Sequence, residues 1–132
     1  MTKAYISCPI PVAMSALAEV ANKLARQGYE PSAWVRGTDY KDDQLREASI
    51  FVLMSQSNNF DYQLDYMTAG CRKELALAKS LGKPLYMAYW KNGKDLNIYP
   101  INLKHLEKGR VLGESGSYLG EVSKVINNYQ IF

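Results

Sequence analysis

The feature that most constrains the fold is an uninterrupted apolar run, Ile50–Met54. Such a run has no polar face, as expected for a central strand of a parallel sheet that is covered on both sides. Strand-like segments also occur at residues 3–8, 29–35 and 85–89, and helix-like segments lie between the strands. This alternation predicts an α/β fold, a three-layer sandwich with a mostly parallel central sheet of about five strands.

The helices are indicated by apolar residues at helical spacing. They are expected at residues 12–27, 41–48 and 68–82, the first ending at Gly28. After residue 89 the pattern is less regular: we expect a polar turn at residues 91–95, an unassigned segment at 97–102, a strand near 110–112 and a terminal helix at about 117–128. The 132 residues contain no repeat or low-complexity segment. We therefore expect residues 1–132 to form one domain of Rossmann/flavodoxin-like class.

Composition argues against several functional classes. The net charge is +3 with scattered basic residues, which does not favour a nucleic-acid partner. The single histidine, His105, and two isolated cysteines, Cys8 and Cys71, give no metal-binding spacing, so we expect no metal site. Reduced cysteines fit a cytoplasmic protein. No apolar run is long enough to span a membrane, and residues 3–8 already read as a strand rather than as a signal peptide.

Glu74 departs from the pattern of its own helix. At about 100° per residue, it falls inside the apolar arc formed by Cys71, Leu75, Ala78 and Leu81, whereas Arg72 and Lys73 are expected on the polar side. A charge turned toward a core costs several kcal/mol unless partners compensate it. The carboxylate is therefore either kept for chemistry, or a core-edge group satisfied by main-chain N–H groups or a distant lysine.

Several polar segments should meet near Glu74. The carboxyl ends of parallel strands lie at one edge of a sheet, and ligands bind there. This edge should bring together residues 8–10, residues 36–40, the chain from Ser55 onward and the start of the Glu74 helix. Residues 55–67 form a long polar and aromatic segment, which we expect to be a functional loop.

Four motifs follow one another in a recognisable order. They are residues 5–10 after the first strand, the segment 42–48 before the apolar strand, Thr68 with Gly70 and Glu74, and residues 78–84 before the next strand. In order and spacing the chain resembles the nucleoside 2-deoxyribosyltransferase-like superfamily, which includes the 2'-deoxynucleoside 5'-monophosphate N-glycosidases. The resemblance covers residues 3–89.

The resemblance implies an N-glycosidase or deoxyribosyltransferase. Glu74 matches the family's nucleophile, which attacks C1' of a nucleoside or its 5'-monophosphate to form a glycosyl ester. Asp42 or Asp43 would be the general acid that protonates the leaving base. The implied substrate-binding residues are Tyr5, Cys8, Pro9, Ile10, Thr68, Ala69, Gly70 and Asn102, the last reaching a neighbouring subunit. The resemblance implies no metal or cofactor, and a homo-oligomer, a dimer or larger, that completes each site.

Other interpretations stay open. The first turn is Cys8, Pro9, Ile10, Pro11 instead of a glycine-rich loop, which is compatible with a protein that binds a nucleotide-derived ligand without cleaving it. The tyrosine-rich loop alone would suit a protein-interaction domain. Asp42 and Asp43 are also favourable charges for a helix N-terminus, Thr68 is also a good N-cap, and the cysteines also suit small buried positions.

Overall fold

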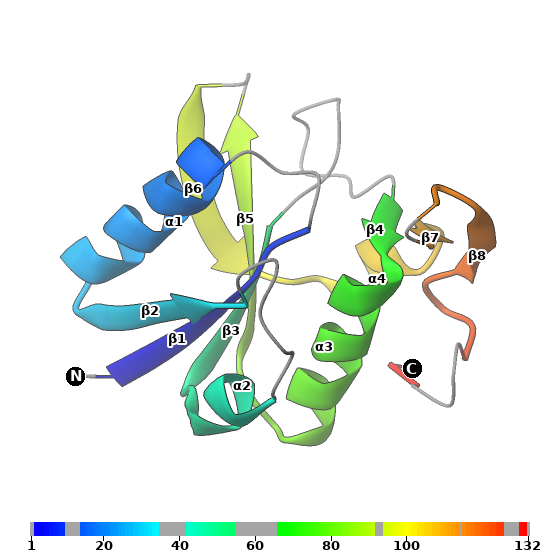
Figure 1. Cartoon of the computed structure of the whole chain (residues 1–132), viewed down its shortest axis with the longest axis horizontal. Helices are drawn as coiled ribbons and strands as arrows, with labels where there is room; N and C mark the ends of the chain where they lie inside the picture. Colours follow the sequence, from blue (N-terminus) through cyan, green and yellow to red (C-terminus); the bar gives the residue numbers. More distant parts are fainter. Residues whose placement is uncertain are drawn as a thin grey trace.

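The main sheet has five strands in the order β2-β1-β3-β5-β6 (Figure 1). The computed structural model describes residues 2–9, 14–34, 42–54, 66–91, 94–113, 115–125 and 130–131. The strands are β1 (Thr2–Ser7), β2 (Tyr29–Ala33), β3 (Ile50–Met54), β5 (Leu85–Lys91) and β6 (Asp95–Pro100). The first four strands are parallel to one another, and β6 runs antiparallel to β5. The prediction of a mixed α/β fold with a mostly parallel five-stranded sheet is confirmed.

Helices lie on both faces of this sheet. Helix α1 (Met14–Arg26) packs Val20 and Leu24 against one face, whereas α2 (Asp43–Glu47) and α3 (Ala69–Ser80) lie on the other. Successive side chains of a strand point to opposite faces. The apolar run at 50–54 therefore divides between the two layers: Ile50, Val52 and Met54 join the α1 cluster, and Phe51 and Leu53 join the α3 cluster.

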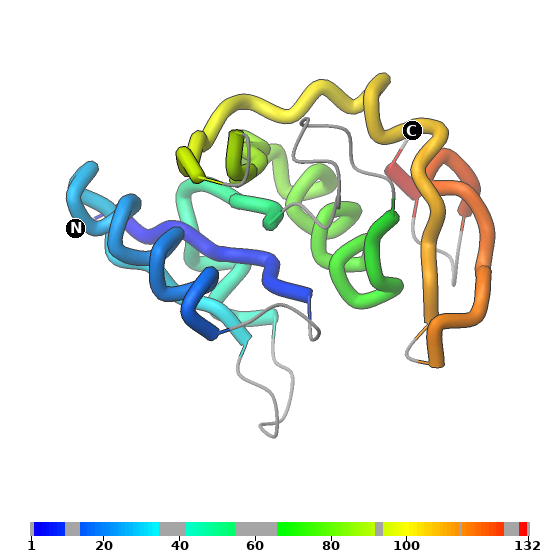
Figure 2. The backbone as a smooth tube through the Cα atoms, turned by 90° about the horizontal axis from the view of Figure 1, so that it is seen from above, coloured from blue at the N-terminus to red at the C-terminus, as the bar shows by residue number. Residues whose placement is uncertain are grey.

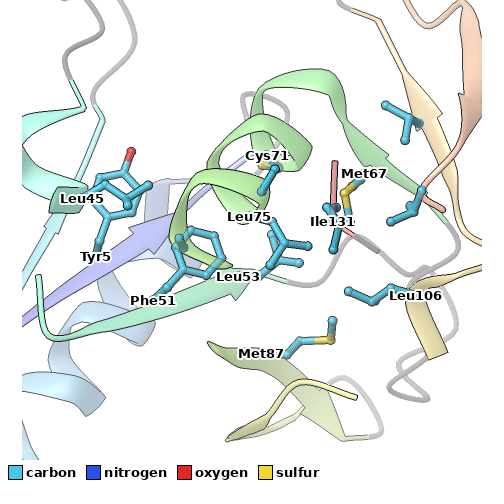
Figure 3. Packing of buried hydrophobic residues seen from close by; sticks show 14 of the residues in the cluster. Tyr5, Leu45, Phe51, Leu53, Met67, Cys71, Leu75, Met87, Leu106 and Ile131 are labelled. Carbon is cyan, nitrogen blue, oxygen red and sulfur yellow. The ribbon is translucent and has the colours of Figure 1, made fainter. Parts of the chain in front are cut away.

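A second, smaller sheet lies at the end of the molecule away from α1 (Figure 2). Its strands are β4 (Tyr66–Thr68), β7 (Arg110–Leu112) and β8 (Tyr118–Glu121), and the short helix α4 (Leu103–Leu106) precedes β7. One apolar cluster connects this sheet with α3 and the main sheet (Figure 3), and its members include Phe51, Met67, Leu75, Leu106, Val111 and Ile131. In the described segments no helix has the length and apolar character needed to cross a membrane.

The terminal helix predicted at about 117–128 is wrong for the residues that the structure describes. Tyr118–Glu121 is strand β8, which pairs antiparallel with β7, and turns follow it. Gly116 and Gly120 have φ values of 82° and 143°, which an α-helix does not accommodate. Residues 126–128 lie outside the described part of the chain.

Two further expectations, about α3 and about the segment that precedes it, are corrected. Tyr66 and Met67, predicted as the end of a loop, and Thr68, predicted as the first helical residue, form strand β4 because β7 offers a parallel partner; residues 55–65 lie outside the described segments. Arg72, expected on the polar face, is 1% exposed, whereas Leu81, expected in the apolar arc, is 38% exposed. The guanidinium of Arg72 donates from Nε to the Val122 carbonyl at 3.2 Å and from Nη2 to the Lys124 carbonyl. The C-terminal segment thus covers that side of α3.

Candidate functional site

Glu74 is the centre of a buried polar cluster between α3 and β1. Its side chain is 8% exposed. Ser7 Oγ donates to Glu74 Oε1 at 3.0 Å, and the Tyr5 hydroxyl donates to Oε2. Tyr5 and Ser7 are two residues apart on β1, so they point to the same face of the sheet, toward α3. Within the described residues, the hydrogen bonds to the Glu74 carboxylate therefore come from two strand hydroxyls.

The local sequence explains this arrangement. Residues Ala4 and Ile6 point to the α1 layer, which leaves Tyr5 and Ser7 for the α3 layer. The ring of Tyr5 stacks on Phe51 of β3 with centroids 6.2 Å apart, and this contact holds the phenol beneath α3 (Figure 3). Thr68 is the N-cap of helix α3, and its Oγ1 accepts a hydrogen bond from the Cys71 main-chain N–H at 3.2 Å. The N-cap fixes where the helix starts, and so which strand residues Glu74 faces.

Burial dominates the electrostatics of the cluster. It raises the pKa of Glu74 from 4.5 to about 7, while the hydrogen bonds from Tyr5 and Ser7 and the charge of Lys73 act in the opposite direction. Burial and the neighbouring Glu74 charge raise the pKa of Cys8 to about 11 and that of Cys71 to about 12. Both thiols are therefore protonated at neutral pH, and Glu74 is the group of this cluster that changes charge near pH 7.

The predicted binding residues fall into two groups. Tyr5, Cys8 and Thr68 lie in or beside the Glu74 cluster, Pro9 is buried directly after Cys8, and Ala69 and Gly70 form the first turn of α3. Asn102 has a capping contact of its own: it ends the connection after β6, where its Oδ1 accepts from the Lys104 N–H at 3.0 Å as the N-cap of α4. Ile10 lies outside the described residues.

The two candidate general acids have contacts other than Glu74 among the described residues. Asp42 forms an exposed ion pair with Arg46 at 3.0 Å, and Asp43 is exposed in the first turn of α2. Lys83 Nζ donates to the Arg46 carbonyl at 2.8 Å, so α2 lies beside the turn that follows α3. Figure 1 shows α2 at the end of the sheet where β3 begins, whereas the N-terminus of α3 lies at the opposite end.

Ser7 is the site residue that sequence reasoning missed. The alternation of side chains along a strand could have identified it. Once Tyr5 is assigned to the ligand face, the residue two positions later must share that face. Within the described part of the chain, no group of three or more His, Cys, Asp or Glu side chains is arranged to hold a metal ion. Comparison with family models, curated proteins and solved structures finds no match.

Proposed function

We propose that the protein cleaves the N-glycosidic bond of a (deoxy)nucleoside or its 5'-monophosphate, as an N-glycosidase or a 2-deoxyribosyltransferase with Glu74 as nucleophile. The observation that carries this proposal is a nearly buried carboxylate whose two oxygens accept hydrogen bonds from Tyr5 and Ser7. Such an environment suits a group that must approach a developing positive charge away from water.

The sheet topology adds support for a ligand site at this place. The order β2-β1-β3-β5-β6 changes direction between β1 and β3, which is compatible with a Rossmann/flavodoxin-like sandwich. In open α/β sheets, ligands bind outside the carboxyl ends of the strands at such a point. Ser7 is the last residue of β1 and pairs in register with Leu53 of β3. The hydroxyl that donates to Glu74 therefore lies at the point where the strand order changes direction.

The proposed reaction has two steps. A Glu74 oxygen attacks C1' while the bond from C1' to the base nitrogen breaks; the bonding electrons leave with the base, which takes a proton from an acid, Asp42 or Asp43 in this proposal. Water then gives a proton to the carboxylate of that acid and attacks C1', which releases the Glu74 carboxylate; a second base that attacks through a ring nitrogen, and loses its N–H proton in the same way, gives transfer. A 5'-phosphate would bind near Thr68 and the N–H groups of Ala69 and Gly70.

Release of free base from a panel of nucleosides and 5'-monophosphates tests the proposal. Glu74→Gln and Glu74→Ala should lower turnover by more than about a thousandfold, since both remove the nucleophile. Glu19→Gln is the matched control, because Glu19 is an exposed glutamate of α1 on the other layer. Undiminished turnover in both Glu74 variants would rule out the nucleophile assignment.

Covalent trapping separates this mechanism from direct hydrolysis. A 2'-fluorinated substrate destabilises the oxocarbenium-like state, so an ester on Glu74 should persist long enough to raise the mass of the intact protein. The added mass should be lost in Glu74→Gln. Turnover of ordinary substrates without any trapped adduct would favour direct attack by water.

The candidate acids are tested by leaving-group dependence. Asp42→Asn or Asp43→Asn should slow substrates with ordinary bases by about 100-fold or more, and should spare an analogue whose leaving group needs no proton. Equal rates for wild type and both variants with every substrate would remove these residues from the mechanism. The role of Asp42 would then be its ion pair with Arg46, and that of Asp43 its favourable charge in the first turn of α2.

One observation favours a second function, binding of a nucleotide-derived ligand without cleavage. Because the pKa of Glu74 is raised to about 7, much of the carboxyl is uncharged near neutral pH, and an uncharged carboxyl is a poor nucleophile but a good hydrogen-bond donor. Calorimetry that shows tight binding, with no base released over hours at pH 6 to 9, would support this function over catalysis.

A homo-oligomer also belongs to the proposal. Apolar side chains of the C-terminal part are exposed, with Tyr118 at 60%, Leu119 at 45% and Val125 at 56%. Burial of such side chains between copies would remove apolar surface from water. Sedimentation equilibrium should report a dimer or larger species, and Leu119→Asp should weaken it; a concentration-independent monomer would contradict the expectation.

A further inference from the structure

Ser7 is a buried hydroxyl at the candidate site whose role the proposed reaction does not define. It is 0% exposed at the end of β1, and its Oγ lies 3.0 Å from Glu74 Oε1. Tyr5 serves the other oxygen, Oε2, from two residues earlier on the same strand. Each oxygen of the carboxylate thus has its own donor from β1, and the two donors together define the plane and the rotation of the carboxylate.

We propose that Ser7 is a positioning residue for Glu74: its hydroxyl holds Oε1 in place and favours the ionised carboxylate. A hydrogen bond to the charged form of an acid stabilises that form, and does so more strongly where water is excluded. The catalytic consequence of this inference rests on the proposed function, but the effect of Ser7 on Glu74 is a property of the folded protein alone.

A substitution of Ser7 changes a hydrogen bond to Glu74 without changing any charge near it. The titratable and charged groups that interact with Glu74 in the described residues are Tyr5 and Cys8 from β1 and its following turn, and Cys71 and Lys73 from α3. Ser7→Ala removes one neutral donor and leaves all of these charges as they are. A change in the titration of Glu74 would therefore report the lost hydrogen bond.

The test is a titration of Glu74 by carboxyl ¹³C NMR, with the resonance assigned by its absence in Glu74→Gln. Ser7→Ala should move the titration midpoint upward by about one pH unit or more, the effect of one hydrogen bond to a charged group. Ser7→Cys, which keeps the size and supplies a weaker donor, should give a smaller shift in the same direction. Ser80→Ala is the matched control, because its hydroxyl on α3 is exposed and donates only to the Leu77 carbonyl.

A titration of Ser7→Ala that coincides with wild type and Ser80→Ala would overturn the inference. If Ser7→Ala does not fold, Ser7→Cys decides the question by the same criterion. Where a substrate is turned over, the rising limb of the pH–rate profile should move with the NMR midpoint, which lowers turnover at pH 7 about fivefold with little change in KM. A shifted midpoint with an unshifted pH–rate profile would uphold the role of Ser7 and reject Glu74 as the reacting group.

Discussion

The replacement Glu74→Gln makes a quantitative prediction about stability and pH. Burial raises the pKa of Glu74 in the folded protein from 4.5 to about 7. In this interval the folded state binds more protons than the unfolded state, so the free energy of unfolding falls as the pH rises. Each pH unit between the two pKa values contributes about 1.4 kcal/mol, and their separation therefore corresponds to roughly 3 kcal/mol lost between about pH 4 and pH 8.

Glutamine has nearly the same size but no charge to titrate. Glu74→Gln should therefore remove this part of the pH dependence. The amide also presents an NH₂ group to one of the two hydroxyl donors, which costs free energy. This cost is the same at every pH, so it lowers the whole curve of unfolding free energy against pH without changing its slope. The informative quantity is therefore the free energy of unfolding of the variant minus that of wild type. This difference should increase by roughly 3 kcal/mol from pH 4.5 to pH 8.

Urea unfolding at half-unit pH intervals, followed by tryptophan fluorescence, measures this difference. Glu19→Gln is again the control, because it removes an exposed carboxylate and should run parallel to wild type. Curves for Glu74→Gln and wild type that stay parallel across the same range would refute the reasoning, since Glu74 would then titrate alike in the folded and unfolded chain.

Three other substitutions test the surroundings of the site by urea unfolding. Thr68→Ala should lose the N-cap of α3 and about 1 kcal/mol of stability, whereas Thr68→Ser should retain most of it; equal losses would contradict the capping role. Leu75→Ala, at a side chain with 0% exposure, should lower the free energy of unfolding by about 2–5 kcal/mol, clearly more than Leu81→Ala on the same helix. Similar losses for the two variants would contradict the burial of Leu75 in the core. Arg72→Met should cost about 1–3 kcal/mol because the buried Val122 carbonyl loses its donor, and it should speed amide exchange after β8. Unchanged exchange there would show that Arg72 does not hold this segment.

Local patterns were sufficient for the parallel strands of the main sheet and for α3. Ile50–Met54 could be assigned because a strand that is apolar at every position requires cover on both faces, and the structure provides α1 on one side and α3 on the other. Helix α3 could be assigned from its apolar spacing and from Thr68 at its start. Glu74 could be singled out because a carboxylate in an apolar arc violates that spacing.

The C-terminal part could not be assigned in this way. A segment such as Tyr118–Glu121 carries no decisive period, and it becomes strand β8 because β7 presents an edge to pair with. Arg72 has the sequence position of a surface residue on α3 and is buried only because the turns after β8 cover it with carbonyl acceptors. Strand pairing and coverage of this kind join residues far apart in the chain, so no window of sequence contains them.

By itself, the sequence determined the alternation of strands and helices and the presence of an anomalous carboxylate, because both follow from which side chains prefer water. Only the tertiary structure decided what that carboxylate meets. It brings the hydroxyls of Tyr5 and Ser7 to the two oxygens of Glu74 across more than sixty residues of chain, with separations of 69 and 67 positions. Those contacts depend on the register of β1 beneath α3, and that register is set by the packing of the whole core.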